Sequence, residues 1–387
     1  MSARGYLGAY QSGNGSIGRT YGNTTTGGSA NGSGGSYGGY GGYYSGAVNA
    51  VYGDPFNPNE VGSGGATENG YGSYVSGNGG GLVRIKAGTF TLNGSILADG
   101  GNGNYVGGGG SGGGIRIDAG ALSGSGYVYA RGGWADNGRG GGGGGRIAVY
   151  YGTMTLPERN MVASGAGTGR NGGAGTVYLK SAMLGTDHLI VDNRGADAGE
   201  GSTLLRSMGS GVVTDVTADT LTTSGVNWQA GSLKGMKFAP DVTRTQYFTV
   251  VDNDAASLRI DPAEGDLTQA TARGLTFSGV YAFTKVSILG KARLTSLDRF
   301  AVSDELLIDG STLVTNAVTA DKLTIRNSGL MSQWRTTTSQ EFKLDLSIGT
   351  LSIDSTSKID VSARGYLGAY QSGNGSIGRT YGNTTTG

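Results

Sequence analysis

Few residue patterns in this chain are able to support chemistry. Gly13, Gly15 and Gly18 in GNGSIG match the dinucleotide-binding fingerprint by letters. That fingerprint needs a strand before it, a helix after it and an acidic residue about 20 positions on. Here TYGNTTTGGSANGSGG follows, which is incompatible with a helix. Because the chain has 80 glycines among 387 residues, a chance match is expected, and we predict no nucleotide site.

The single histidine, His188, stands beside a strand-like run, and the chain has no cysteine. A zinc site takes several Cys or His ligands, so we expect a structural or surface role for His188. The lack of thiols is also more typical of a bacterial surface protein than of a cytosolic one.

Two groups of oxygen-bearing side chains are candidates for calcium. One is Asp54, Asn57 and Glu60 in YGDPFNPNE, and the other is Asp252 and Asp254 in the turn between FTVV and SLRI. Calcium takes carboxylate and amide oxygens as ligands, but Asp and Asn are also the ordinary residues of such turns. Both interpretations stay open, and no other cofactor is predicted.

Enzymes that act on polysaccharides need carboxylates or basic residues clustered on one face. Arg84, Arg116 and Arg146, spaced 32 and 30 residues apart, would form a ladder on successive coils or a solvated stripe. The other outward-facing charges are scattered: Lys86, Asp118, Asp309, Arg326 and Asp360. We therefore predict no catalytic residues and a non-enzymatic protein.

The elements that position these residues read as strands. Short runs of Val, Ile, Leu, Thr and Tyr are bounded by Gly, Asn, Asp and Ser, which is the strand signature. Units beginning at Gly79, Gly112 and Gly143 each read as a strand, a tight turn, a second strand and a glycine-rich loop. A period of about 30 residues with two strands predicts one coil of a parallel β-helix.

Shorter coils follow in the C-terminal part. Similar strands recur there at 286–288, 306–308, 323–325 and 351–353, and alternate apolar with polar residues. One face of each strand should then point to a core and the other to solvent. We predict an all-β fold: a right-handed parallel β-helix, or solenoid, with glycine-rich loops and one inserted small β-barrel or sandwich domain.

Four regions are expected along the chain. They are glycine-rich solenoid coils over 1–202 with a long Gly/Tyr loop at 5–80, the inserted β domain over 203–273, further solenoid coils over 274–361, and the start of the next tandem repeat at 362–387. Insertions are tolerated in exposed loops, which is where the solenoid would accept the small domain.

Glycine-rich loops have three alternative interpretations. They could stack coil on coil, form a bundle of extended glycine helices with three residues per turn, or remain disordered. Four tyrosines, Tyr37, Tyr40, Tyr43 and Tyr44, lie in the first long loop. They could pack within that loop, or stack on sugars or a partner.

The opening stretch, Ser2 to Gly27, returns letter for letter at Ser362 to Gly387. We expect one period of a tandem array, cut from a longer chain whose targeting segment and anchor lie outside it, with Met1 marking only where the fragment was cut. The net charge of +1 gives no field to recruit nucleic acid or anionic membrane. No apolar run reaches the ~18 residues of a membrane helix, so we predict no membrane contact in this segment.

The repeated GGG–hydrophobic–Arg–Ile units, interleaved with VNWQAGSLKGMKF and FTVVDNDAASLRID, resemble giant repetitive glycine-rich cell-surface and fibre proteins of bacteria with pectin-lyase-like β-helix repeats. The resemblance implies an extracellular or cell-surface location and a structural repeat unit of a fibre or filament. Its partners would be neighbouring copies, in the same chain, end to end or side by side.

Two alternatives stay open. The solenoid could be an adhesin stalk whose inserted domain or Gly/Tyr loop binds surface glycan or protein. Less favoured is a polysaccharide-active enzyme.

Overall fold

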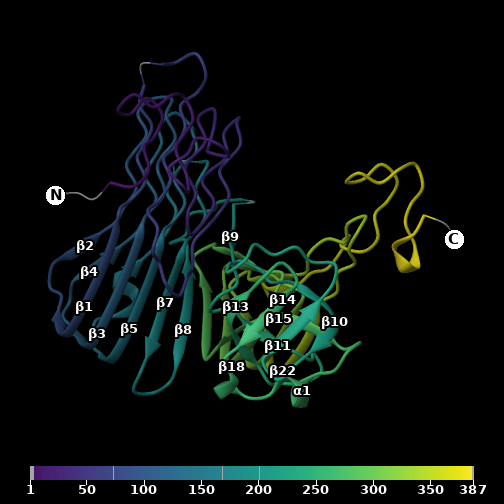
Figure 1. The fold of residues 1–387 in the computed structure, drawn as a ribbon. Coiled ribbons are helices and arrows are strands. Elements are labelled where there is room, and N and C mark those ends of the chain that lie inside the picture. The colour runs from purple at the N-terminus through teal and green to yellow at the C-terminus, as the bar shows by residue number, and fades with distance from the viewer. Residues whose placement is uncertain (1–3, 73, 168, 200, 386–387) are drawn as a thin grey trace.

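The computed structural model describes residues 4–72, 74–167, 169–199 and 201–385. Regular structure in it is nearly all β, with 37% strand and 3% helix. The strands form one mixed sheet of 15 strands and two smaller sheets of five and three (Figure 1). None of the helices in these ranges has the length and hydropathy that a bilayer-spanning helix requires.

The glycine-rich half contains a first stack of parallel strands. Its long strands are β1 (Leu82–Thr91), β3 (Gly114–Ser123), β5 (Arg146–Met154) and β7 (Thr176–Ser181). Its short strands are β2 (Ser95–Leu97), β4 (Tyr127–Tyr129) and β6 (Met161–Val162). Ile117 and Val149 are neighbours in the ladder and are fully buried. Apolar side chains from both sets of strands form one core, as the alternating pattern predicts.

A second stack follows. Its long strands are β8 (Asp187–Asp192), β16 (Lys285–Leu289), β18 (Arg299–Asp309), β20 (Ala317–Arg326) and β22 (Asp345–Ile353). Its short strands are β9 (Thr203–Leu204), β17 (Arg293–Thr295), β19 (Thr312–Val314), β21 (Leu330–Ser332) and β23 (Lys358–Ile359). Val286, Leu306, Leu323 and Leu351 occupy one row of the parallel ladder. The predicted register of the short coils is therefore confirmed.

The two stacks meet at a hairpin that the sequence analysis missed. β7 and β8 pair antiparallel, with Tyr178 opposite Leu189. Only residues 182–186 separate the two strands, whereas a parallel return needs a crossover of a dozen residues or more. An uninterrupted run of parallel coils is therefore wrong at this point, and the main sheet is mixed.

Antiparallel strands fill most of the segment between β9 and β16. They are β10 (Ser210–Val216), β11 (Thr220–Thr223), β12 (Lys237–Ala239), β13 (Phe248–Asn253), β14 (Ser257–Ile260) and β15 (Thr276–Phe283), with the short helix α1 (Leu267–Ala270). Phe238, Phe248 and Leu258 are buried in their core. β15 also pairs parallel with β18, so this module is joined to the second stack by hydrogen bonds. Its limits as a separate domain stay a prediction.

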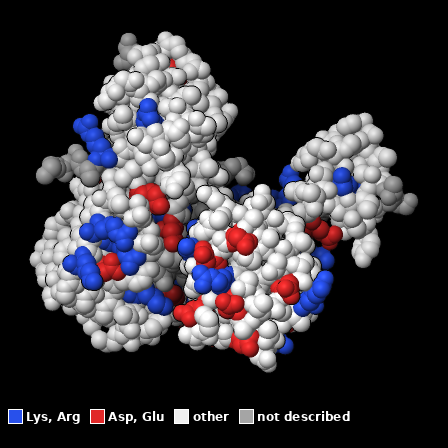
Figure 2. Space-filling view, in the orientation of Figure 1, with Lys and Arg blue, Asp and Glu red and all other residues white. Residues whose placement is uncertain are grey.

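Glycine-rich segments rise from one end of the first stack as long extended threads (Figure 1). We call residues 4–81, 98–113, 130–145 and 163–175, apart from 73 and 168, the glycine bundle. In the view of Figure 2 its surface is almost free of charged side chains, which gather instead over the strands below. The second copy of the opening stretch lies on the opposite side of the molecule (Figure 1, yellow). Residues 2, 3, 386 and 387 of the two copies lie outside the described residues.

Candidate functional site

Each thread of the glycine bundle is hydrogen-bonded to several neighbours in turn. Successive N–H groups of residues 108–113 donate over 2.7–3.0 Å to different threads: Gly108 to Ala66, Gly109 to Gly140, Gly110 to Gly101, Ser111 to Ser63, Gly112 to Gly143 and Gly113 to Ala98. The same neighbour therefore recurs every third residue. This is the period of an extended helix with three residues per turn, which is one of the three interpretations left open above.

Close backbone approach explains why these positions are glycine. A Cβ atom added at Gly142 would lie 1.9 Å from the carbonyl oxygen of Gly110, and one at Gly109 would lie 2.0 Å from that of Gly133. Neither residue has a φ in the left-handed range, so conformational freedom is not the requirement here. The threads use glycine because any side chain would separate them.

Asn49 ties four segments of the bundle together from the inside. Its side chain is 1% exposed. Oδ1 accepts from Ser29 Oγ at 2.9 Å and Ser36 N at 2.7 Å, and Nδ2 donates to Thr20 Oγ1 at 3.0 Å and Ser63 Oγ at 3.1 Å. A buried polar network of this kind fixes one arrangement when all its groups are paired.

Arg146 joins the bundle to the first stack. Both alternatives for the three arginines, a ladder and a solvated stripe, are wrong at Arg146, since Arg84 pairs with Arg116 whereas Arg146 pairs with Gly114 and is buried. The shift of two residues keeps Arg146 on the same face of the sheet but moves it to the start of β5, beneath the bundle. There it is 2% exposed and donates from Nε to the carbonyl of Tyr52 at 3.0 Å.

The four tyrosines of the Gly/Tyr loop have different surroundings. Tyr37 is fully buried, and its ring centroid is 4.8 Å from that of Tyr52. Tyr44 lies between two guanidinium groups, each centred 4.6 Å from its ring. Tyr40 is half-buried, while Tyr43 is 62% exposed. Tyr37 and Tyr44 thus make contacts inside the bundle, whereas Tyr43 faces solvent.

In the first candidate calcium group, each side chain accepts a hydrogen bond from another part of the protein. Asp54 Oδ1 accepts from Phe56 N at 2.8 Å, Asn57 Oδ1 accepts from an Arg116 Nη atom at 2.8 Å, and Glu60 accepts from the Tyr37 hydroxyl at 3.4 Å.

In the second candidate group, Asp252 forms ion pairs with Lys234 and Arg259, at 3.1 and 3.6 Å. Asp254 accepts backbone bonds inside its own turn. In the described part of the chain no three His, Cys, Asp or Glu side chains are gathered as a metal site would need. Calcium binding stays an untested prediction.

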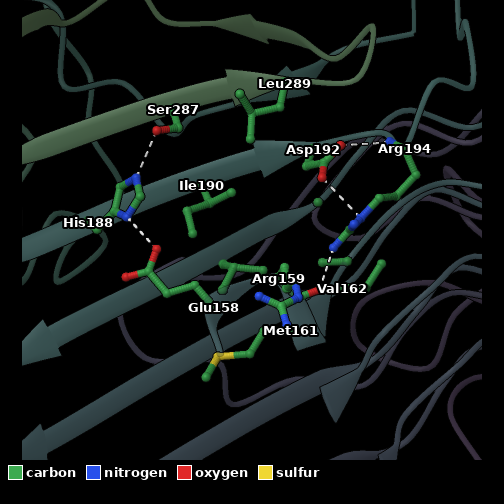
Figure 3. Close-up of a pocket in the computed structure, with 13 residues that line it drawn as sticks. Glu158, Arg159, Met161, Val162, His188, Ile190, Asp192, Arg194, Ser287 and Leu289 are labelled. Atoms are coloured by element: carbon green, nitrogen blue, oxygen red, sulfur yellow. Dashed lines mark hydrogen bonds and ion pairs between the residues drawn. The ribbon is translucent and has the colours of Figure 1, made fainter. Parts of the chain in front are cut away.

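His188 lines a pocket of about 310 Å³ at the junction of the two stacks (Figure 3). Its Nε2 is 2.9 Å from Ser287 Oγ on β16, and its Nδ1 is 3.1 Å from Glu158 Oε2 on the far side. The hydrogen bond from His188 is the main reason that the pKa of Glu158 is lowered. Opposite this row, Arg194 pairs with Asp192 at 3.0 Å (Figure 3).

A hydroxyl, an imidazole and a carboxylate in a row have the order of a nucleophile, its base and an orienting acid. Acyl transfer also needs donors aimed at the developing oxyanion. Ser287 is 4% exposed and lies in the middle of β16, whose backbone is paired on both sides with β8 and β18. The backbone N–H groups of β16 are thus engaged in the sheet, and the strand offers no pair of free donors for an oxyanion. We interpret the row as a tie that fixes residue 158 to the second stack.

No protein-family model, curated protein or solved structure matches this chain. A function must therefore be argued from the geometry of the chain itself.

Sequence reasoning missed two features of this region. Glu158 and Ser287 are far from His188 in sequence, and no motif connects them. Asn49 stands in SGAVNAVYG among residues that read as an ordinary loop. Asparagine is common in that half of the chain, so no sequence signal distinguishes Asn49.

Proposed function

We propose that this chain is a non-enzymatic structural repeat unit of an extracellular fibre or cell-surface filament. In this proposal each stack is a set of right-handed parallel β-helix coils, the chain direction reverses between the stacks at β7 and β8, and the glycine bundle projects from the side of the first stack. The partners are neighbouring copies of the same unit.

One observation carries the proposal: the last long strand exposes apolar side chains that inner strands bury. Leu323 and Ile325 of β20 are fully buried, whereas their neighbours in the ladder, Leu351 and Ile353 of β22, are 48% and 41% exposed. A solenoid is stabilised by stacking against its neighbours. An open edge with apolar side chains is a template for further pairing, so this end is suited to receive another copy.

The opposite end is also open. β1 and β2 pair with inner strands on one side only, and β1 is half-buried at most where β3 has several buried residues. Leu97 at the end of β2 is 59% exposed. The outer strands of the first stack and of the second stack are therefore both edges that a neighbouring unit would cover.

The expected spacing follows from the strand order. One unit contributes β1, β3, β5, β7, β8, β16, β18, β20 and β22 along the main sheet. At roughly 4.8 Å between strands, a unit would advance about 45 Å. Electron microscopy of the protein at high concentration should reveal filaments with this axial repeat. Monomeric globular particles under all conditions would contradict the proposal.

An adhesin role is a second candidate, favoured by one surface. A hollow of about 770 Å³ beside the Gly/Tyr loop is lined by Tyr40, Tyr43, Arg170, Asn171 and Asp197. An exposed aromatic ring next to polar and charged groups is suited to stack on a sugar while the polar groups bond its hydroxyls. A glycan array with the wild-type protein and Tyr43→Ala tests this candidate. A glycan bound by the first and not by the second supports it.

A further inference from the structure

The duplicated stretch folds in the same way at both ends of the chain. Tyr10 and Tyr370 have φ angles of 54° and 59°, in the left-handed region where such residues are uncommon. Asn14 donates to the carbonyls of Gly8 and Ile17, and its counterpart Asn374 donates to those of Gly368 and Ile377. The conformation is therefore specified by contacts within the stretch itself.

The surroundings of the two copies differ. The first copy exchanges backbone bonds with three threads of the glycine bundle: Gly5 N to Gly79 O, Tyr6 N to Gly62 O, Ala9 N to Gly65 O, Gly18 N to Ser29 O, Gly79 N to Tyr6 O, Ser76 N to Ala9 O and Gly64 N to Arg19 O. Thr20 of this copy also enters the buried Asn49 network. The first copy is thus an integral part of the bundle.

The second copy hydrogen-bonds instead to the loop at 336–341, away from the bundle (Figure 1). Tyr366 donates from its hydroxyl to Glu341 at 3.0 Å, and Thr336 N donates to Arg364 O at 3.0 Å. Tyr370 and Tyr381 are 81% and 89% exposed. This copy is already shaped for a bundle but does not lie in one.

We propose that residues 364–385 are a docking segment for the glycine bundle of another copy of this unit, where they take the place that residues 4–25 occupy. This docking deepens the structural role proposed above and rests on it in one respect, namely that the fibre brings copies of the unit together. The partner is a second copy because the fit is set by sequence identity and by the spacing of glycines.

The steric evidence comes from Gly5, Gly8 and Gly18. A Cβ atom at Gly5 would lie 2.4 Å from Gly80 O. A Cβ atom at Gly8 would lie 2.5 Å from Ser76 O, and one at Gly18 would lie 2.2 Å from Gly64 O. At the counterparts, a Cβ atom at Gly365 would meet nothing within 4 Å, one at Gly368 would lie no closer than 3.4 Å to the Gln371 side chain, and one at Gly378 would lie 4.0 Å from Leu367 O. At these three positions the second copy therefore has glycine without the close backbone contacts that require it in the first copy.

Docking would also bring the two open edges together. In the first copy, Arg4 forms a bridge with Gly80, and Gly80 lies just before the start of β1. In the second copy the equivalent residue, Arg364, follows β23 by only a few positions. Seating residues 364–385 in a second bundle therefore places the exposed end of one stack beside β1 of the next.

The test uses the full chain with matched substitutions. Gly5→Ala, Gly8→Ala and Gly18→Ala together should expel the first copy and leave its place open to the C-terminal copy of another molecule. The same three changes at Gly365, Gly368 and Gly378 are the control. Sedimentation should show head-to-tail oligomers for the first variant only. The control should stay monomeric, with the β circular-dichroism signal and thermal stability of the wild type.

A chain with all six substitutions decides the mechanism. In this variant the first copy is expelled from the bundle, but the altered second copy no longer fits the vacated place. The protein should therefore stay monomeric. Equal oligomerisation of the six-fold variant, or a folded first variant that remains monomeric, would overturn the inference.

The single variant Gly18→Ala gives a second readout that needs less disruption. A fluorescent peptide with the sequence of residues 362–387 should bind it at least about tenfold more tightly than it binds the wild type, whose own first copy competes in cis. The same peptide with Ala at the Gly378 position should not bind. No binding to Gly18→Ala overturns docking, while filaments of about 45 Å repeat seen without docking would leave the proposed function standing.

Discussion

Arg146 and Tyr37 face each other in the interior, with the guanidinium carbon 5.7 Å from the ring centroid and the two side chains 2% and 0% exposed. One residue begins β5 and the other lies in the glycine bundle. Burial lowers the pKa of Arg146 and raises that of Tyr37. This contact therefore holds a cation inside the protein by an aromatic face and two hydrogen bonds, to Tyr52 O and Thr176 Oγ1.

Replacing Arg146 should weaken the attachment of the bundle. We expect Arg146→Ala to lower the free energy of unfolding by about 3 kcal/mol or more, since it opens a cavity and leaves buried acceptors unpaired. Arg84→Ala, at an exposed ladder position, should change it by less than about 0.5 kcal/mol. Urea unfolding measures both. Equal effects would show that the buried contact has no special role.

A single methyl group should disrupt the glycine bundle. Gly142→Ala places a Cβ 1.9 Å from the Gly110 carbonyl, and backbone on both sides limits relaxation. We expect a loss of about 3 kcal/mol, the upper end of the usual cost of overpacking. Gly94→Ala is the control, because a Cβ there meets nothing within 4 Å. It should change stability by less than about 1 kcal/mol. Unfolding curves in urea distinguish the two, and similar curves would contradict the close-packed arrangement.

Loss of the Asn49 network should loosen the bundle without unfolding the stacks. Asn49→Ala leaves the buried Ser36 N–H and neighbouring hydroxyls without partners, at a cost of about 1–3 kcal/mol for each unpaired group. Hydrogen exchange should show faster exchange at Gly64 and Ser36, with the amides of β18 and β20 unchanged. Asn69→Ala, at an exposed residue, should leave every rate as in the wild type. Uniform acceleration across the chain would count against a local role.

The tie between Glu158 and His188 should be sensitive to acid. Because the pKa of Glu158 is lowered from 4.5 in the folded protein, its contribution to stability is present above that value and is lost as pH falls through the lowered value. The free energy of unfolding of the wild type should therefore fall more steeply below pH 4.5 than that of Glu158→Gln. Parallel pH profiles for the two proteins would refute this expectation.

Much of the strand pattern was accessible from the sequence. The rows that contain Ile117 and Val149, or Leu323 and Leu351, follow from alternation and repeat spacing, because both reflect one local constraint: every second residue faces the core. The hairpin between β7 and β8 was not accessible in this way. Its five-residue turn looks like any other, and its direction depends on the second stack that receives β8.

The sites were less accessible than the strands. Arg146 was grouped with Arg84 and Arg116, in a ladder or a solvated stripe, because a spacing of 30 resembles one of 32, yet the two-residue difference moves it under the bundle. The pairing of His188 with Glu158 and Ser287 joins three segments that only the junction of the stacks brings together. Pattern reasoning identifies faces and periods, while such contacts depend on tertiary packing.

The hydrogen-bonding of the threads to several neighbours has a thermal consequence. The bundle buries peptide groups in place of large apolar side chains, and exposure of polar surface lowers the heat capacity of unfolding whereas exposure of apolar surface raises it. The two stacks, with their Ile, Leu and Val cores, should have strongly curved stability against temperature. The bundle should have a flatter curve and resist cold better, so that on chilling the apolar half weakens first.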